Sequence, residues 1–407
     1  MADSSPARST GAGRWLLVLI ITGILTQTSL NLVRPVSTYK LISFDAGAVT
    51  VGAVTAAYAL LPLFSAMWLG RFSSRLRQIR YLMLAGAVVL AIGGAGLELA
   101  PNAFFVAVAS AVLGLGHLMF TIGGQSSIAR FLPDDQLDKG FGWFTAAYSV
   151  GQFLGPLVAG WVLGSGTDPA SLQRIGDIRA ALWIGAAAAV LAVPFLLLNL
   201  QPKHVKAPVS KTGKTQQASL GQIMKIKGMG SHMLASLTLL CMLDILTAFM
   251  PLVGEKHNVA PAAVGVLLAI RGVSSVASRL CIPALSRRFE RRTLLLASMY
   301  TASVTIAAAP LFIDILPLSG AAMLAGGFFL GLGQPMTMTL VSTSVPPQDR
   351  GAALAARLVG NRFGQVLLPV VASSVAAGLG PAGAIWFCCG LLAASGVEKT
   401  LRRPVGT

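Results

Sequence analysis

Twelve apolar segments, each long enough to cross a lipid bilayer, constrain this chain more than any other feature. A membrane-spanning helix needs about 20 mostly apolar residues. The segments of that length are residues 14–36, 48–70, 80–99, 103–128, 140–164, 178–200, 230–253, 260–284, 292–314, 318–343, 351–377 and 381–397. Only 11% of the 407 residues are charged, whereas a soluble domain has about 25%. The sequence therefore predicts an all-α integral membrane protein, with the lipid bilayer as its surroundings.

One long polar connection divides the twelve segments into two sets of six. We predict a tail over 1–13, a six-helix bundle over 14–200, a flexible linker over 201–229, a second six-helix bundle over 230–397 and a tail over 398–407. Of the 31 Lys and Arg, 22 lie in the tails, the linker and the loops on their side of the membrane. Four lie in the predicted outer loops: Lys40, Arg174, Arg179 and Lys256. Cytoplasmic loops carry the excess of Lys and Arg, so we expect cytoplasmic N- and C-termini and a plasma membrane location, specifically a bacterial inner membrane.

The two halves repeat at a shift of 213 residues. Gly151-Gln152 and Pro156 recur as Gly364-Gln365 and Pro369, and Val51-Gly52 recurs as Val264-Gly265. The repeats are parallel, because six spans return the chain to the same side of the membrane. Parallel halves with a site between them at the midplane are typical of secondary transporters.

The stretch from 142 to 160 has glycines and a proline at regular places: Gly142, Gly151, Gly155, Pro156 and Gly160. This spacing resembles the fifth-helix signature of antiporters in the major facilitator superfamily, and the resemblance extends from about 14 to 398. It implies two pseudo-symmetric bundles that move a small organic solute by alternating access. The family's gating loop is matched by Gly70 and Arg75, and by Arg288 in the second half. Ser74 stands where the family has an aspartate.

Ionisable residues in the middle of a span cost about 2.5–3.5 kcal/mol each on insertion scales, so they need a partner or a function. Of the 14 acidic residues, Asp244 is the one that falls in mid-span; Arg271 and Arg362 also fall there. Under the repeat, Asp244 replaces Asn31 and Arg271 replaces Tyr58. Two interpretations stay open. Asp244 pairs with Arg271 or Arg362 to hold helices together, or Asp244 exchanges a proton while the arginines bind an anionic substrate group.

Polar stripes at helical spacing extend this candidate site. Arg271, Ser274, Ser275 and Ser278 share one face of a helix, as do Arg357, Asn361 and Gln365. For proton coupling we predict Asp244, Arg271 and His117. For substrate binding we predict Asn31, Arg34, Tyr58, Gln152, Arg271, Ser275, Gln334, Asn361, Arg362 and Gln365. The alternatives are that the serines, His117 and Tyr58 only pack helices, and that Arg34 snorkels to the outer surface.

Other function classes lack their motifs. The sequence has no ATP-binding P-loop, no metal-ligand spacing and no nucleophile constellation, and its four cysteines lie in apolar segments. The net charge of +17 is scattered between spans, which argues against nucleic-acid binding. We therefore predict a monomeric, non-enzymatic secondary transporter without a cofactor, working by proton-linked antiport to export an anionic or amphipathic compound. The alternatives are an uptake symporter for an organic anion, and a membrane enzyme or sensor that keeps this scaffold without transport.

Overall fold

Helices make up almost all of the computed structural model, which describes residues 7–132, 136–198, 220–226, 228–346 and 349–401. No strand occurs among these residues. The first bundle contains α1 (Ala7–Ile42), α2 (Ala48–Arg75), α3 (Arg80–Leu99), α4 (Ala103–Phe131), α5 (Leu137–Leu163) and α6 (Leu172–Leu197). The short α7 (Leu220–Met224) precedes the second, which contains α8 (Met229–Lys256), α9 (Pro261–Arg288), α10 (Arg291–Leu311), α11 (Leu316–Thr343), α12 (Arg350–Leu379) and α13 (Pro381–Leu401).

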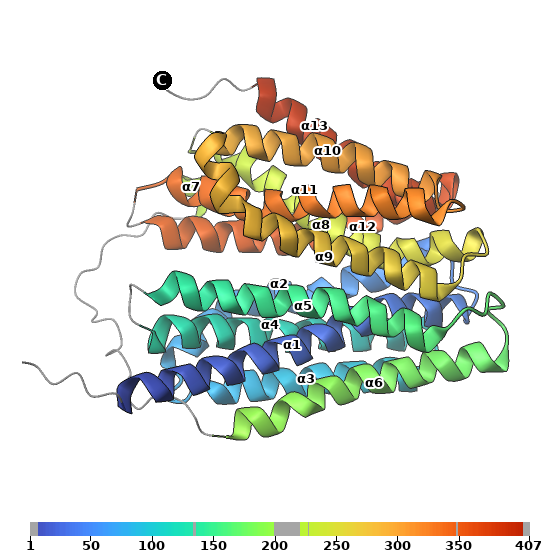
Figure 1. The fold of residues 1–407 in the computed structure, drawn as a ribbon, viewed down its shortest axis with the longest axis horizontal. Helices are drawn as coiled ribbons and strands as arrows, with labels where there is room; N and C mark the ends of the chain where they lie inside the picture. The colour runs from blue at the N-terminus through green and yellow to red at the C-terminus, as the bar shows by residue number, and fades with distance from the viewer. Residues whose placement is uncertain (1–6, 133–135, 199–219, 227, 347–348, 402–407) are drawn as a thin grey trace, which may run out of the picture.

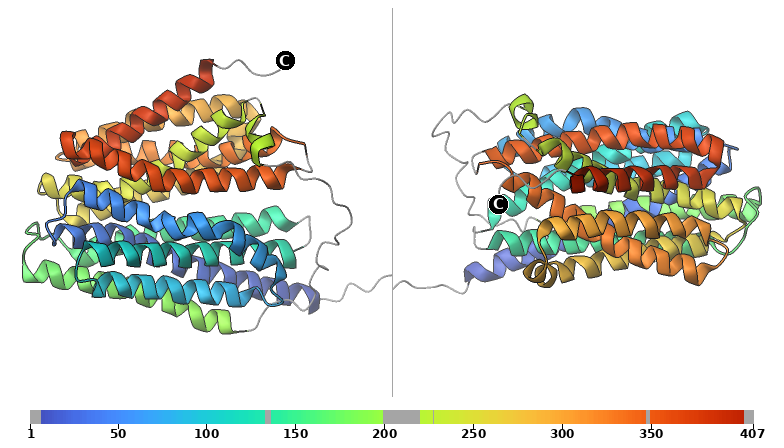
Figure 2. Two further views of the ribbon diagram at one scale, coloured as in Figure 1. Left: turned by 180° about the vertical axis from the view of Figure 1, so that it is seen from behind. Right: turned by 90° about the horizontal axis from the view of Figure 1, so that it is seen from above.

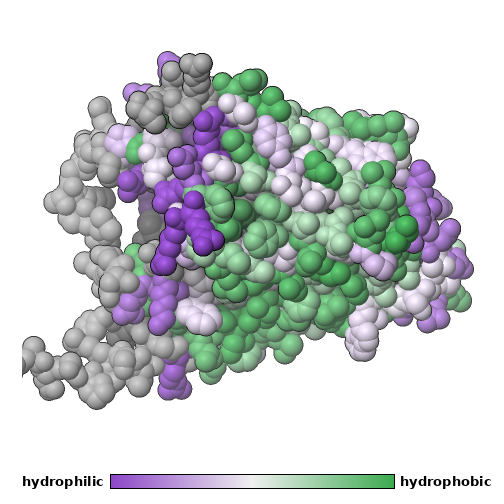
Figure 3. Space-filling model, turned by 45° about the horizontal axis from the view of Figure 1, so that its top comes forward, coloured by the Kyte–Doolittle hydropathy of each residue, from purple (hydrophilic) through white to green (hydrophobic). Residues whose placement is uncertain are grey.

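Twelve of the described helices are long and apolar enough to span a membrane. Figure 1 shows α1–α6 on one side of the molecule and α8–α13 on the other, with the helix axes roughly parallel. The view from behind in Figure 2 shows the same division. The start of α1 and the end of α13 lie at the same end of the bundles, which we call the terminal end. Figure 3 shows a broad hydrophobic band between two hydrophilic ends, as a bilayer requires of the surface of a spanning protein.

The helix pairs with the most extensive contacts between the bundles are α2 with α12 and α5 with α9, followed by α1 with α8 and α2 with α8. Close approach occurs toward the end opposite the termini, which we call the opposite end. A Cβ added to Gly265 would lie 2.6 Å from the Pro156 carbonyl oxygen and 2.7 Å from the Gly160 Cα. The Ala262 amide there donates to the Gly164 carbonyl at 3.1 Å. The absence of side chains at these glycines therefore lets α5 and α9 touch backbone to backbone.

Some helix ends differ from those expected. The first helix continues through Pro35 to Ile42, so Lys40 lies in its last turn. The sixth begins at Leu172, so Arg174 and Arg179 lie in a helix and not in the predicted outer loop. Hydropathy alone predicted an end too early for the first helix and a start too late for the sixth. Charged residues lie inside the start of the sixth helix because they form ion pairs: Arg174 with Glu255 and Arg179 with Glu98, both at 3.0 Å.

The predicted linker over 201–229 falls largely outside the described residues. Within its described part, Leu220–Met224 forms α7. The buried side chain of Ile223 joins a hydrophobic cluster that contains Val341 and Ala353. This part of the linker therefore packs against the second bundle.

The glycines of the 142–160 stretch fit α5 against α1. A Cβ at Gly151 would lie 2.3 Å from the Cβ of Gln27, and one at Gly155 would lie 2.7 Å from the backbone of Asn31. Gly142 differs, because a Cβ there would meet nothing within 4 Å. The signature therefore contains glycines that a close helix crossing requires and one that it does not.

We expect Gly151→Val to destabilise the protein, whereas Gly142→Val, on the same helix, leaves stability nearly unchanged. Overpacking at a tight contact costs about 1–3 kcal/mol or more, because the helices must move apart. Thermal unfolding of the purified proteins in detergent measures the difference. Equal melting temperatures for the two variants would contradict the helix contact described here.

Candidate functional site

An ion pair between the bundles lies at the centre of the candidate site. A guanidinium nitrogen of Arg34 on α1 lies 2.7 Å from a carboxylate oxygen of Asp244 on α8. The side chains are 15% and 7% exposed, so water screens the attraction only weakly. The sequence left open a pair of Asp244 with Arg271 or Arg362; both alternatives are wrong in this structure, because the partner is Arg34. Arg34 lies close to Asp244 because α1 packs against α8.

The second carboxylate oxygen of Asp244 connects this pair to α12. The Gln365 side-chain amide donates to it at 2.6 Å, and Arg362 donates to the Gln365 amide oxygen at 2.9 Å. Arg362 therefore reaches Asp244 through an amide and not by direct contact. The carboxylate is oriented from both bundles, by a cation on one side and an amide on the other.

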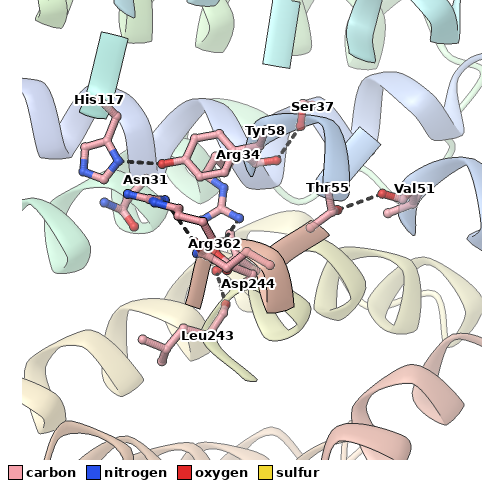
Figure 4. A network of polar contacts seen from close by, with 12 residues as sticks. Asn31, Arg34, Ser37, Val51, Thr55, Tyr58, His117, Leu243, Asp244 and Arg362 are labelled. Atoms are coloured by element: carbon pink, nitrogen blue, oxygen red, sulfur yellow. Dashed lines mark hydrogen bonds and ion pairs between the residues drawn. The ribbon is translucent and has the colours of Figure 1, made fainter. Parts of the chain in front are cut away.

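The network continues into the first bundle through Tyr58 and His117 (Figure 4). The Arg34 guanidinium lies 4.4 Å from the centre of the Tyr58 ring, within the range of a cation–π interaction. The Tyr58 hydroxyl and the Nδ1 of His117 are 2.6 Å apart and share a hydrogen bond. A continuous chain of side chains thus runs from His117 on α4 to Arg362 on α12, with the ion pair in its middle.

Two more predicted residues lie on the same helices and bond locally. Asn31 donates to the carbonyl oxygen of Gln27 at 2.8 Å and to its side-chain oxygen at 3.3 Å. Asn361 is buried and accepts from the Ser236 hydroxyl at 3.1 Å. Asn31 and Asn361 therefore stand beside the network without joining it.

Other predicted residues lie on the helices that flank the network. Ser275 of α9 is buried against α11, since a Cβ at Gly331 would lie 2.7 Å from its Cα. Gln152 lies where α5 approaches Gly272 of α9. The Gln334 side-chain nitrogen on α11 is buried and has no hydrogen-bond partner among the described residues. Gln334 thus has an unused donor.

Arg271 differs from the other predicted charged residues, because it is buried and has no partner among the described residues. It is 3% exposed, and no hydrogen bond or ion pair from it reaches any residue that the structure describes. Arg34, Arg279 and Asp244 lie within its electrostatic reach. A buried cation without a partner costs far more than a paired one, so its presence requires a reason.

A small cavity borders the ion pair on its opposite-end side. Its lining includes Arg34, Ser37, Tyr58, Ser110 and Thr247. Its volume of about 20 Å³ is enough for about one water molecule. With the close glycine contacts between α5 and α9, this shows that the path between the bundles is narrow beyond the ion pair.

The predicted gating residues lie far from the network. Arg75 and Arg288 are exposed in the last turns of α2 and α9, and Gly70 has open space around it. The end of α2 is fastened by Arg130 of α4, which donates to the Leu76 carbonyl at 2.6 Å. The sequence does not distinguish Arg130, because a basic residue at a helix end is usually a solvated charge.

A second ion pair joins the bundles and was not predicted from the sequence. Arg174 of α6 is 3% exposed and pairs with Glu255 of α8 at 3.0 Å. It donates to the Gly166 carbonyl at 2.7 Å and lies 4.7 Å from the Tyr39 ring centre. No sequence signal distinguishes these two charges from loop charges, because they meet only when the bundles pack together.

Among the described residues, no group of three or more His, Cys, Asp or Glu side chains could hold a metal ion. The four cysteines are all free, and three of them are buried. The polar groups of the network are therefore guanidinium, carboxylate, imidazole, amide and hydroxyl groups.

The fold and this interior agree with the comparisons to known proteins. The sequence model of the Major Facilitator Superfamily matches residues 16–252 and 232–405. The chain belongs to the Major Facilitator Superfamily. As a member of that superfamily it is a multi-pass membrane transporter, not an enzyme.

Individual members show the same fold with low sequence identity. The nucleoside transporter NupG superposes with a TM-score of 0.70 at 16% identity, covering 95% of this chain and 99% of its own. A D-xylose–proton symporter gives 0.72 at 16% identity, covering 97% and 98%. The class B tetracycline resistance protein of Escherichia coli is 32% identical over 154 residues. That match covers 36% of each chain, so this superfamily member spans about a third of that relative's length in the alignment.

The buried pair predicts a non-additive response to mutation. Arg34→Gln and Asp244→Asn should each destabilise the protein by about 3–5 kcal/mol, because each leaves an uncompensated buried charge. The double variant should lose less than the sum of the two. Unfolding of the four proteins in detergent measures the coupling.

Asp314→Asn is the control, since its pair with His257 is exposed, with Asp314 64% and His257 36% exposed. Exposed pairs contribute about 0–1 kcal/mol. Additive losses in the Arg34 and Asp244 variants would show that the two side chains do not stabilise each other.

Proposed function

We propose that this transporter exports an anionic or amphipathic organic solute in exchange for protons, with Asp244 as the proton carrier. The observation that carries the proposal is the buried pair of Asp244 with Arg34 across the two bundles. It supplies an acidic group that can bind a proton and a cation that can bind an anion. Both groups lie where one bundle contacts the other.

The pair gives a physical basis for exchange. With neither proton nor solute bound, Asp244 and Arg34 attract one another and hold α1 against α8. A proton on Asp244 removes one charge of the pair. A solute anion close to Arg34 competes with Asp244 for the other charge. Either event frees the bundles to rock, while the empty, unprotonated form stays held. Antiport requires this behaviour, because the empty carrier must not return alone.

Symport imposes the opposite requirement. A symporter must hold its singly loaded forms and move both when it carries proton and solute together and when it is empty. The Arg34–Asp244 pair does not distinguish the doubly loaded form from the singly loaded forms, because loss of either charge breaks the attraction. The pair therefore favours the antiporter over the uptake symporter, although the D-xylose–proton symporter shares the fold.

Two further observations support export of an anion. The interior has an excess of positive charge, because Asp244 is the one mid-helix aspartate against five arginines. The five mid-helix arginines are Arg34, Arg271, Arg279, Arg357 and Arg362. The glycine spacing of α5 is similar to that of the superfamily's antiporters. The relative from Escherichia coli is a tetracycline resistance protein, which places tetracycline among the compounds to test. We further propose that the terminal end faces the cytoplasm of a bacterial inner membrane and that the transporter is monomeric.

Inside-out membrane vesicles with an acidified lumen test this proposal. Pools of organic anions, cations and neutral amphiphiles, tetracycline among them, are added to the medium while the luminal pH is recorded. We expect one anionic or amphipathic pool to discharge the gradient in the parent. The Asp244→Asn variant should not discharge it, yet should still let the labelled solute run down its own gradient, because the bundles are no longer held.

Asp314→Asn is the matched control, since Asp314 is exposed and pairs with His257 at the opposite end. It should behave as the parent does. Discharge by Asp244→Asn at the parent's rate would remove the proton role. Discharge only when the solute is preloaded in the lumen would identify a symporter.

A further inference from the structure

We infer that α9 carries a two-arginine clamp, Arg271 with Arg279, and that the transported solute is an organic dianion. This inference rests on the proposed passage of an anionic solute between the bundles and makes its chemical class specific. It assigns Arg271 as the primary anion-binding group. The ion pair of Arg34 and Asp244 keeps its separate role in coupling.

Two equally buried arginines show why Arg271 points to a ligand. Arg174 and Arg271 are both 3% exposed. Arg174 has a carboxylate, a carbonyl oxygen and an aromatic ring as partners. Arg271 has no partner among the described residues. The Nε of both arginines is buried and unbonded in the part of the chain that the structure describes, so the difference lies in the terminal guanidinium nitrogens. Buried guanidinium groups normally have acceptors, and none of the described residues supplies one for Arg271, which points to a bound anion.

The second half of the clamp lies two turns further along α9. Eight residues separate Arg271 from Arg279, a rise of about 12 Å. Arg279 donates one hydrogen bond, at 2.5 Å, to the Ser149 hydroxyl of α5 in the first bundle, and its buried Nε has no partner among the described residues. Long side chains on one helix can approach each other over this rise, and Arg279 is within the electrostatic reach of Arg271.

Charge balance sets the valence of the solute. Two like charges in a low-dielectric interior repel, and each is destabilising until an anion lies beside it. Asp244 makes no direct contact with Arg271, because its two oxygens bond Arg34 and Gln365, and its single charge is already paired with Arg34. Arg357 and Arg362 have the neutral partners Thr337 and Gln365 and are not part of the clamp. One negative charge for each arginine of the clamp gives a solute with two negative charges. Guanidinium groups bind carboxylate and phosphate oxygens in pairs, so either chemistry fits.

The test measures equilibrium binding to the purified full-length protein in detergent, without any gradient. The probes are the dianions isophthalate and phenyl phosphate, the monoanion benzoate and the neutral isophthalamide. We expect at least one dianion to raise the melting temperature, with benzoate and isophthalamide giving little shift. Arg271→Gln should weaken dianion binding by about 10- to 100-fold, as expected for the loss of charge-assisted hydrogen bonds. Arg279→Gln should weaken it to a smaller extent.

A second readout separates a binding role from a structural one. Without ligand, Arg271→Gln should raise the melting temperature, because it removes an unpaired buried charge. Arg174→Gln, at the same burial, should lower it, because Glu255 then loses its partner. These two shifts have opposite signs only if Arg271 is unpaired in the empty protein.

Several outcomes would overturn the clamp. With the parent, they are equal stabilisation by isophthalamide and isophthalate, or no stabilisation by either dianion. With Arg271→Gln, they are dianion binding as tight as in the parent, or a lower melting temperature than the parent without ligand. The proposed proton exchange fails separately, in the vesicle assay with Asp244→Asn. Arg271→Lys, which keeps the charge and loses the paired hydrogen bonds, should fold and bind the dianion more weakly than the parent.

Discussion

The attraction between Arg34 and Asp244 is the constraint on which the interior depends. Opposite charges attract strongly in a medium of low dielectric constant, and neither charge tolerates isolation there. Their 2.7 Å contact fixes α1 against α8. The other neighbours follow from it: Gln365 satisfies the second carboxylate oxygen and Tyr58 faces the guanidinium. An interaction that spans the bundles and responds to protonation is suited to couple their movement to a proton.

The two halves share a fold but not a charge distribution. The repeat places Asp244 at the position of Asn31, and Arg271 at that of Tyr58. Four of the five mid-helix arginines lie in the second half, and the fifth is Arg34. The first half also has the buried Arg174, near the start of α6. At the network, the second bundle supplies most of the charged groups, and the first supplies Arg34 and the Tyr58 ring that faces it.

The sequence predicted the fold and much of the membership of the site, but not its pairings. Apolar length gave twelve spans, because a bilayer requires about 20 apolar residues of any helix that crosses it. The rarity of mid-span charge drew attention to Asp244, Arg271 and Arg362. Their partners could not be read in the same way. The distance of Arg34 from Asp244 depends on how the two bundles pack. In the sequence Arg174 resembles an outer-loop residue, and only the structure shows its ion pair with Glu255.

By itself, the sequence determined that the chain is a two-bundle membrane protein with charges in its interior. Hydropathy and repeats can be read from the order of the residues, without knowing how the helices pack. The tertiary structure decided which of those charges are satisfied. Asp244 meets Arg34 and Gln365, while Arg271, with the same type of side chain as Arg174 and equal burial, meets no described partner. The physical reason is that Coulomb and hydrogen-bond energies depend on separation and direction in space, which helix packing sets and sequence spacing does not.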